Sequence, residues 1–296
     1  MNDHYAEVNG IRLHYVSAGE GQTMLFLHGF PEFWYLWRSQ LEEFGTDHQA
    51  VALDMRGYNL SDKPEKVEDY STKHLVADVK GILDHLSPGK KSILIAHDWG
   101  GAVAWTFAWT HPEYIEKLVI INAPHPTVFL RELANNPRQQ RASAYMHLFR
   151  KPVAEERLSA NNCQFLRNVV FTDSARPDAY TEEDRNAYIE AWTRPGALTG
   201  GLNYYRAMAA GPPRNETEAA ATAAVFEHLV ASRSHVIELP TLVIWGMEDI
   251  ALLPGNIDGL DEYVPDLRVK RIPDGTHWVI SEQPTVINAA IREFIE

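Results

Sequence analysis

The sequence has little cysteine, a shortage of positive charge and no long apolar segment. Cys163 is the only cysteine among 296 residues, so no disulfide can form within the chain and nothing favours an oxidising compartment. The 27 lysines and arginines are outnumbered by 40 aspartates and glutamates, and the net charge of −13 would repel a phosphate backbone. We therefore expect no nucleic-acid partner, and we expect Cys163 to be a buried thiol.

Signals for a membrane, for secretion and for a metal are missing as well. No uninterrupted apolar run is long enough to cross a bilayer, and residues 1–7 lack the basic start and apolar centre of a signal peptide. His97, His125 and His147 do not have metal-ligand spacing such as His-Glu-x-x-His. We expect a cytoplasmic protein with no membrane contact, metal or cofactor, present as a monomer or homodimer. Its 45% hydrophobic and 23% charged residues are typical of a globular chain.

Short strands alternate with helices along the first part of the chain. Two β-type runs, 5–8 and 11–16, flank Asn9-Gly10, which is a strong two-residue hairpin signal. An apolar helical stripe covers residues 75–86. Buried strands are predicted at 24–27, 50–53, 93–96 and 118–121. This alternation predicts an α/β fold with a mostly parallel sheet flanked by helices.

The pattern changes after residue 125, where helical segments and proline breaks replace strands. The predicted helices cover 128–134, 138–149, 181–192 after an N-capping Thr181, and 196–209. Residues 211–213 and the alanine-rich 218–224 predict a loop and a return segment. Strands resume at 241–245 and 267–272, before a final helix. We therefore expect a core domain of residues 1–125 and 235–296 and an inserted helical cap domain of residues 126–234.

Asp98 lies between the predicted strand 93–96 and a helix predicted to start at Trp99. Its neighbours two positions away, Ala96 and Gly100, are small, as the sharp strand-to-helix turn called a nucleophile elbow requires. Free N–H groups and the positive dipole end of the helix would keep an aspartate there ionised and nucleophilic. An aspartate that merely caps a buried helix would also fit this stretch.

Asp249 and His277 each follow a late predicted strand, where open α/β sheets place their ligand-binding loops. Taken alone, they could be a loop carboxylate and a half-exposed histidine. Their order with Asp98 along the chain, nucleophile, then acid, then histidine, is that of the α/β-hydrolases.

A loop that begins HGFP, residues 28–31, follows the predicted strand 24–27. In an α/β-hydrolase this loop completes the oxyanion hole together with the residue after the nucleophile. We expect the backbone N–H groups of Phe30 and Trp99 to converge on developing negative charge. An aromatic-rich structural loop is the alternative interpretation of this segment.

At this point the sequence resembles the epoxide hydrolases of the α/β-hydrolase superfamily over nearly its whole length. Residues 28–31, HGFP, and 97–101, HDWGG, resemble the oxyanion-loop and nucleophile motifs of that family, in which the peptide before the proline is commonly cis. Residues 200–207, GGLNYYRA, are similar to the cap segment that carries one ring-opening tyrosine, matched here by Tyr205. The resemblance implies a second in residues 143–149, where Tyr145 is the only tyrosine.

The resemblance implies an enzyme that opens an epoxide to a vicinal diol in two steps. Asp98 would attack an epoxide carbon while Tyr145 and Tyr205 hydrogen-bond the oxygen, and His277, oriented by Asp249, would activate water against the resulting ester. An aspartate suits this chemistry because its ester has an electrophilic carbonyl, whereas a serine would leave an ether. The partners would be a small-molecule epoxide and water. The implied substrate-binding residues are Phe30, Trp99, Tyr145, Tyr205 and Trp278.

Two other functions stay open at this stage. Haloalkane dehalogenases use the same Asp-His-Asp set, but many of them place Asn or Glu where this chain has Phe30. Fluoroacetate dehalogenases hold a carboxylate with arginines just after the nucleophile, where this chain has Trp99 and Ala102. A non-catalytic protein of the same fold could hold a small molecule under the cap, although it would not need the full set of reacting side chains that is present here.

The tyrosine pair predicts the substrate range. We expect terminal and disubstituted epoxides to be consumed and bromoalkanes and fluoroacetate to release little halide, because Tyr145 and Tyr205 serve an epoxide oxygen and the halide clamp is missing. Diol formation and halide release are measured on matched substrates. Halide release that outpaces diol formation would assign the chain to the dehalogenases.

Overall fold

Eight strands form one sheet in the order β1-β2-β4-β3-β5-β6-β7-β8 in the computed structural model, which describes residues 1–172, 176–208, 211–232 and 235–296. The strands are β1 Asn2–Val8, β2 Ile11–Ala18, β3 Thr23–Leu27, β4 Gln49–Leu53, β5 Ser92–His97, β6 Ile115–Ile121, β7 Thr241–Gly246 and β8 Leu267–Ile272. Strand β2 pairs antiparallel with β1 and β4, and all other pairs are parallel. The predicted α/β-hydrolase fold is confirmed.

The hairpin at the start of the chain follows from two residues with left-handed backbone. Asn9 and Gly10 have φ of 50° and 76°, the combination that a tight hairpin turn with the right twist requires. Strands β1 and β2 pair from Val8 opposite Ile11 outward. The hairpin predicted from Asn9-Gly10 is therefore confirmed.

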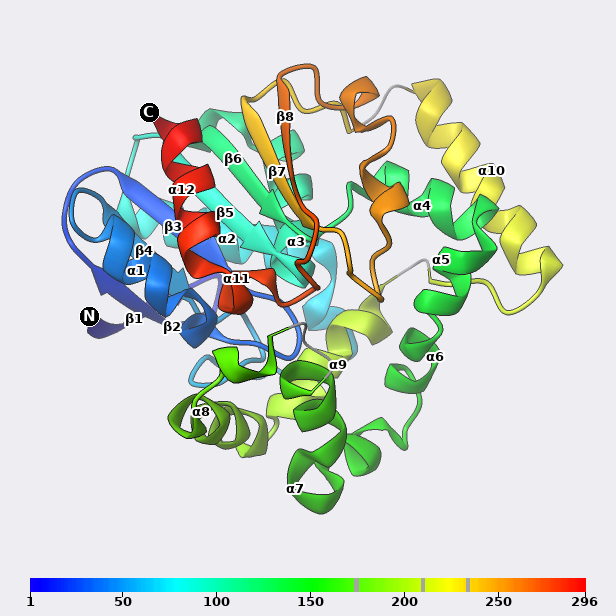
Figure 1. The fold of residues 1–296 in the computed structure, drawn as a ribbon, viewed down its shortest axis with the longest axis horizontal. Coiled ribbons are helices and arrows are strands. Elements are labelled where there is room, and N and C mark those ends of the chain that lie inside the picture. The colour runs from blue at the N-terminus through cyan, green and yellow to red at the C-terminus, as the bar shows by residue number, and fades with distance from the viewer. Residues whose placement is uncertain (173–175, 209–210, 233–234) are drawn as a thin grey trace.

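Helices cover both faces of the sheet (Figure 1). The helices α1 Arg38–Phe44, α11 Val279–Glu282 and α12 Pro284–Ile295 lie on one face, and α2 Thr72–Leu86 and α3 Asp98–Thr110 lie on the other. Side chains alternate between the two faces along each strand. Met24 and Phe26 of β3 belong to the cluster of α1 and α12, whereas Leu25 and Leu27 belong to that of α2 and α3.

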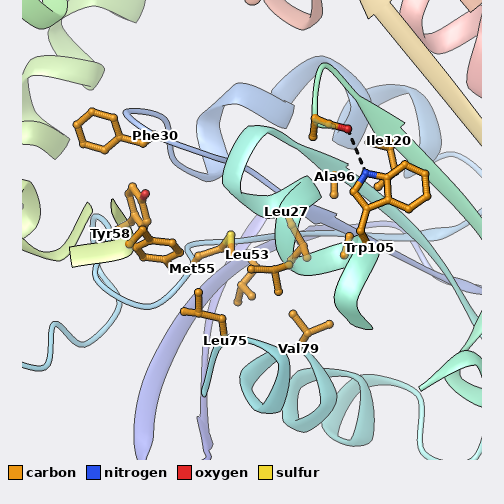
Figure 2. Packing of buried hydrophobic residues seen from close by; sticks show 14 of the residues in the cluster. Leu27, Phe30, Leu53, Met55, Tyr58, Leu75, Val79, Ala96, Trp105 and Ile120 are labelled. Atoms are coloured by element: carbon orange, nitrogen blue, oxygen red, sulfur yellow. Dashed lines mark hydrogen bonds between the residues drawn. The ribbon is translucent and has the colours of Figure 1, made fainter. Parts of the chain in front are cut away.

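The core on the α2 and α3 side positions the helix that follows Asp98. Figure 2 shows Leu27 and Leu53 from the sheet beside Leu75 and Val79 of α2. Trp105 of α3 is fully buried, and its indole N–H donates to a backbone carbonyl of Ala123 at 3.0 Å. The helix is therefore fixed against the sheet by both apolar packing and a directional bond.

Among the described residues between β6 and β7 there are seven α-helices: α4 Pro126–Asn135, α5 Pro137–Ala142, α6 Tyr145–Phe149, α7 Ala154–Phe171, α8 Glu182–Thr193, α9 Ala197–Ala207 and α10 Glu216–Ser232. Helices α6 to α9 lie beyond the end of the sheet where the parallel strands finish, and α10 packs beside α4 at the side of the sheet (Figure 1). The predicted cap at Thr181 is confirmed, because its side chain accepts from the backbone of Asp184 and the Asp184 side chain accepts in return. Short 3-10 turns occur at 34–37, 67–70, 112–114, 177–179, 254–257 and 260–262.

The structure of this insertion differs from the sequence prediction at 138–149 and at α7. Residues 138–149 form two helices, because bonds of the i to i−3 type tighten the turn between Ser143 and His147. The alanine-rich run 218–224, predicted as a return segment, lies in helix α10, which agrees with the high helix propensity of alanine. Helix α7 was not predicted; residues 160–163 inside it have non-helical backbone angles, which interrupts the apolar stripe.

Other predictions can be placed against the described residues. Cys163 is buried, as expected. Ala209, the predicted end of the helix from 196, and residue 234, the expected end of the cap, lie outside the described residues. Within the described part of the chain, no helix combines the length and apolar character needed to span a membrane.

The loop after β4 is tied to α2 by a buried ion pair. Arg56 donates from Nε and Nη2 to the two carboxylate oxygens of Asp78, both at 2.7 Å, and neither side chain is more than 5% exposed. Asp78 also accepts from the Asn9 side chain at 2.9 Å, which ties the N-terminal hairpin to the same helix.

Breaking this pair should destabilise the fold. We expect Asp78→Ala to lower the free energy of unfolding by about 3–5 kcal/mol, because it leaves the Arg56 charge buried without a counter-charge. Urea unfolding monitored by circular dichroism measures the change. The control is Asp84→Ala on the same helix, which removes an exposed partner of Lys80 and should change stability little. Equal effects of the two substitutions would show that burial adds nothing to the Arg56–Asp78 pair.

Candidate active site

The predicted site residues meet at one edge of the sheet. Phe30 follows β3, Asp98 follows β5, Asp249 follows β7 and His277 follows β8, so all four lie beyond the carboxyl ends of parallel strands. Strands β3 and β5 are neighbours although β4 lies between them in the sequence. The chain therefore changes direction across the sheet at this point, which is where open α/β sheets form a ligand-binding crevice.

Asp98 stands at the sharp turn between β5 and α3. Its φ of 49° places it in the left-handed region, which is unusual for a residue with a side chain. A side chain at Gly100 would overlap the backbone carbonyls of Leu27 and His28, so only glycine allows α3 to approach β3 this closely. The backbone N–H of Phe30 donates to Asp98 Oδ1 at 2.8 Å. The loop after β3 thus contacts the carboxylate directly.

Two further features fix that loop. The peptide bond between Phe30 and Pro31 is cis. The buried His28 donates from Nδ1 to the Gly29 carbonyl and accepts the Met55 N–H at Nε2, and burial lowers the pKa of this imidazole. His28 is therefore neutral and acts as a structural bridge.

His277 lies between the two carboxylates. Its Nδ1–H donates to Asp249 Oδ2 at 2.7 Å, and its Nε2 lies 3.7 Å from Asp98 Oδ2, too far for a direct hydrogen bond. Asp249 is 2% exposed, and its other oxygen accepts from the backbone N–H groups of Ala251 and Leu252, both at 2.8 Å. Asp249 thus fixes the histidine orientation and leaves Nε2 available toward Asp98.

The charges of these groups are coupled. Burial alone would lower the pKa of His277, but the charge and hydrogen bond of Asp249 outweigh it and, with contributions from Asp98 and Glu32, raise the pKa to about 9. Burial alone would raise the pKa of Asp249, yet His277 and the donors around its carboxylate hold that pKa below its ordinary value. In the resting site His277 is therefore the imidazolium and Asp249 the carboxylate.

Tyr145 on α6 and Tyr205 on α9 are brought together above Asp98. Their ring centroids lie 6.1 Å apart, and the Phe149 ring contacts both, at 5.2 Å from Tyr145 and 5.0 Å from Tyr205. The indole of Trp99 meets Tyr205 edge-on at 5.1 Å. Burial, together with the nearby Asp98 charge, raises the pKa of both phenols. Both tyrosines therefore keep their protons at neutral pH and can donate hydrogen bonds.

Two apolar cavities of about 200 and 240 Å³ meet at these residues. Asp98, Tyr145 and Tyr205 border both of them. The first is lined further by Phe30, Phe149, Leu166, His277 and Trp278, and the second by Trp99, Val103, Phe129, Met146 and Leu252. An apolar molecule with one reactive polar centre at Asp98 fits this arrangement.

No cluster of three or more potential metal-binding side chains is found in the part of the chain that the structure describes.

Two further predicted site residues, Trp99 and Trp278, lie next to the triad. Trp99 occupies the first turn of α3, where backbone N–H groups have no acceptor within the helix. Trp278 packs its ring against that of His277, with centroids 4.8 Å apart.

Sequence reasoning missed Asn122. It follows β6, has a φ of 41°, and donates from Nδ2 to Asp249 Oδ2 at 2.8 Å while its Oδ1 accepts the Gly246 N–H at 2.8 Å. The rule that identified Asp249 and His277, a polar residue just after a parallel strand, applies to Asn122 as well and could have found it.

A buried chain of polar groups behind His277 was also missed. The Tyr188 hydroxyl donates to Glu32 Oε1 at 3.2 Å, Glu32 Oε2 lies 3.0 Å from His97 Nδ1, and His97 Nε2 donates to the His277 carbonyl at 2.9 Å. Glu32 and His97 are each 1% exposed. The sequence spacing of Glu32 and His97 does not distinguish them from surface residues. Their partner Tyr188 lies on the distant helix α8, so the contact exists only in the folded chain.

Gln139 on α5 was missed as well. It is fully buried, donates to the Ala251 carbonyl at 2.8 Å and to Ser143 Oγ at 2.9 Å, and accepts the Leu253 N–H at 2.9 Å. Gln139 therefore connects the loop after Asp249 to the segment that leads into Tyr145.

Comparison with known proteins gives consistent matches over the whole chain. The profile of the family described as alpha/beta hydrolase fold matches residues 22–284. Epoxide hydrolase 4 of Mus musculus is 38% identical over 296 residues, covering 97% of this chain and 77% of that protein. The AB hydrolase superfamily protein YfhM of Bacillus subtilis is 37% identical, with 99% and 97% of the two chains covered.

Solved structures give the same result. The crystal structure of Bacillus megaterium epoxide hydrolase in complex with an inhibitor has a TM-score of 0.89 and 37% identity, and the match covers 99% of both chains. A mutant of an epoxide hydrolase from that organism, complexed with its product (R)-3-[1]naphthyloxy-propane-1,2-diol, also has a TM-score of 0.89, at 36% identity.

The coupling between Asp98 and His277 can be measured. We expect Asp98→Asn to lower the pKa of His277 from about 9 by roughly one pH unit or more, because the imidazolium loses a negative charge 3.7 Å away. NMR titration of the His277 ring gives the pKa directly. Asp274→Asn is the control, since that carboxylate is close in sequence but 62% exposed. An unchanged pKa in Asp98→Asn would show that Asp98 does not stabilise the imidazolium.

Proposed function

Since this chain belongs to the epoxide hydrolases of the alpha/beta hydrolase superfamily, we propose that it hydrolyses its epoxide through a covalent ester on Asp98. The observation that supports this mechanism best is the position of the Asp98 carboxylate. One oxygen accepts the Phe30 N–H, the other lies 3.7 Å from His277 Nε2, and Asp98 borders both apolar cavities. The carboxylate is thereby oriented toward bound substrate without needing a base to activate it.

In the first step, Asp98 Oδ2 forms a bond to an epoxide carbon and the ring carbon–oxygen bond breaks. The departing oxygen accepts hydrogen bonds from Tyr145 and Tyr205 and takes a proton from one of them. The raised pKa of both phenols keeps that proton available, and the ring strain of an epoxide makes its oxygen a leaving group that needs only such assistance. The product of this step is a hydroxyalkyl ester.

In the second step, His277 Nε2 takes a proton from water and the resulting hydroxide adds to the Asp98 ester carbonyl. The negative charge then develops on Oδ1, beside the Phe30 N–H, and we propose the Trp99 N–H as the second donor. Collapse of this intermediate breaks the ester bond and releases the vicinal diol. The departing alkoxide takes the proton that His277 accepted from water. The second proton of that water, left on the Asp98 carboxyl group, returns to the tyrosine pair, so Asp98 is again a carboxylate.

The first step also prepares the base for the second. Ester formation removes the negative charge of Asp98, which is one of the charges that raise the pKa of His277. The pKa of His277 therefore falls once the ester exists, which favours release of the imidazolium proton to solvent and formation of the neutral base that the second step needs. Asp249 keeps the ring oriented throughout, because its bond to Nδ1–H is independent of the state of Asp98.

We further propose that residues 126–234 act as a cap domain over a core of residues 1–125 and 235–296. The cap would supply both tyrosines and 7 of the 16 residues that line each cavity, so it would share with the core in selecting the substrate. Relatives with an inhibitor or an aryloxy diol in their structures, and the apolar cavities of this chain, favour an epoxide with an apolar substituent.

Substitution of the base separates the two steps. We expect His277→Gln to form the ester normally, because Asp98 needs no base to attack, and to hydrolyse it at least about a hundredfold more slowly than the parent. Intact-protein mass spectrometry with excess styrene oxide should show the parent mass plus one substrate, and peptide mapping should place the adduct on Asp98. The matched control, Asp98→Asn, should show no adduct.

Oxygen labelling tests the same scheme in the unmodified enzyme. In a single turnover in oxygen-18 water, the new diol oxygen should come from the unlabelled Asp98 carboxylate, and the label should remain on the protein. Direct appearance of the label in the diol of that first turnover, together with no adduct on His277→Gln, would mean that water attacks the epoxide itself.

A further inference from the structure

Arg150 joins the ends of the two helices that carry the tyrosines. It directly follows α6, the helix that begins with Tyr145, and its side chain reaches the end of α9. Its Nε donates to the backbone carbonyl of Tyr205 and its Nη2 to that of Met208, both at 2.8 Å. The Arg150 guanidinium thus hydrogen-bonds the backbone of Tyr205, and Arg150 itself directly follows the helix that carries Tyr145.

The chemistry of this contact favours a guanidinium in particular. The last carbonyls of a helix have no partner within it, and they form the negative end of the helix dipole. A guanidinium presents several donors in a rigid plane, so it can satisfy two such carbonyls at once, whereas a lysine ammonium is a single point charge on a flexible stem. Gly211 lies against Arg150, where an added Cβ would come within 2.8 Å of Nη1. Space is therefore left for the guanidinium.

Helix α6 depends on such anchors. It has five residues, and no side chain caps its N-terminus, so it has little stability of its own. On its inner side Phe149 packs against Tyr205, Tyr145 and Phe30. The Arg150 bonds add direction to this apolar contact and fix α6 relative to the end of α9.

We propose that Arg150 is a positioning residue for ring opening, which holds Tyr145 and Tyr205 at the separation that lets both bond one epoxide oxygen. This inference rests on the proposed roles of the two tyrosines. A displacement of about 1 Å in a positioned group can cost about a hundredfold in rate. Loss of Arg150 therefore impairs the step that uses the tyrosines as proton donors and leaves the action of His277 on the ester unchanged.

Arg206 provides a matched control. It lies next to Tyr205 on α9, and it donates from Nη1 and Nη2 to the two Glu155 oxygens, both at 2.7 Å, which ties α9 to α7. Its Nη2 also lies 3.3 Å from the Lys151 carbonyl, a longer contact to the segment after α6. Its side chain is 17% exposed, so it is also largely buried. Arg206→Met removes an ion pair from the same helix end and leaves in place the Arg150 bonds to the Tyr205 and Met208 carbonyls.

The test compares Arg150→Met, Arg206→Met and Tyr205→Phe with the parent in single-turnover experiments on styrene oxide, in which quenched mass spectrometry resolves ester formation from ester hydrolysis. We expect Arg150→Met to form the ester about tenfold or more slowly and to hydrolyse it within about twofold of the parental rate. Arg206→Met should stay within about twofold in both steps. Thermal unfolding of each variant is recorded, so that a loss of stability is separated from a loss of positioning.

Each outcome decides one point. Ester formation at the parental rate in Arg150→Met, or equal slowing of both steps in both arginine variants, would overturn the positioning role. Tyr205→Phe tests the underlying proposal in the same assay. If it slows ester formation while Arg150→Met does not, the tyrosines are acids and only the Arg150 inference fails. If Tyr205→Phe also has the parental rate, the proposed role of the tyrosines fails with it.

Discussion

The backbone turn at Asp98 is the constraint on which the rest of the site depends. A φ of 49° at a residue with a side chain is unfavourable, and it persists because α3 is fixed from both sides. Trp105 holds the helix to the sheet, and Gly100 allows its start to approach the end of β3. The turn carries the carboxylate out of the sheet, where the Phe30 N–H and the His277 ring can both reach it.

Most of the buried ionisable side chains around Asp98 are in contact with a partner. Asp249, His277, Glu32 and His97 are all at most 7% exposed, and each faces a partner of opposite charge or a hydrogen-bonding group. Asp98 differs, since its Oδ2 lies 3.7 Å from the positively charged His277 ring at Nε2, beyond hydrogen-bond distance. The carboxylate that is proposed to react is thus the least firmly paired of the group, which leaves it free to form a bond to carbon.

The sequence predicts what depends on local pattern and on rules of chain order. Alternating strands and helices, the hairpin at Asn9-Gly10 and the Thr181 cap were correct because each is determined by neighbouring residues. The candidate residues Asp98, Asp249 and His277 could be named because parallel strands bring their ends to one edge. Glu32 and Gln139 could not be found in this way, since their partners lie on distant elements and their importance appears only after the chain has folded. Helix α7 was missed for a local reason, its interrupted backbone.

The place where the helical insertion leaves and rejoins the sheet has an evolutionary consequence. Strands β6 and β7 are parallel neighbours, so the chain departs from one and returns to the next without crossing any other strand. Any segment whose ends can span that gap is compatible with the same sheet. Asp98, Asp249 and His277 are all outside the insertion, whereas Tyr145, Tyr205 and much of the cavity lining are inside it. Mutation and selection can therefore remodel what is bound, and which leaving group is assisted, while the hydrolytic machinery is inherited unchanged.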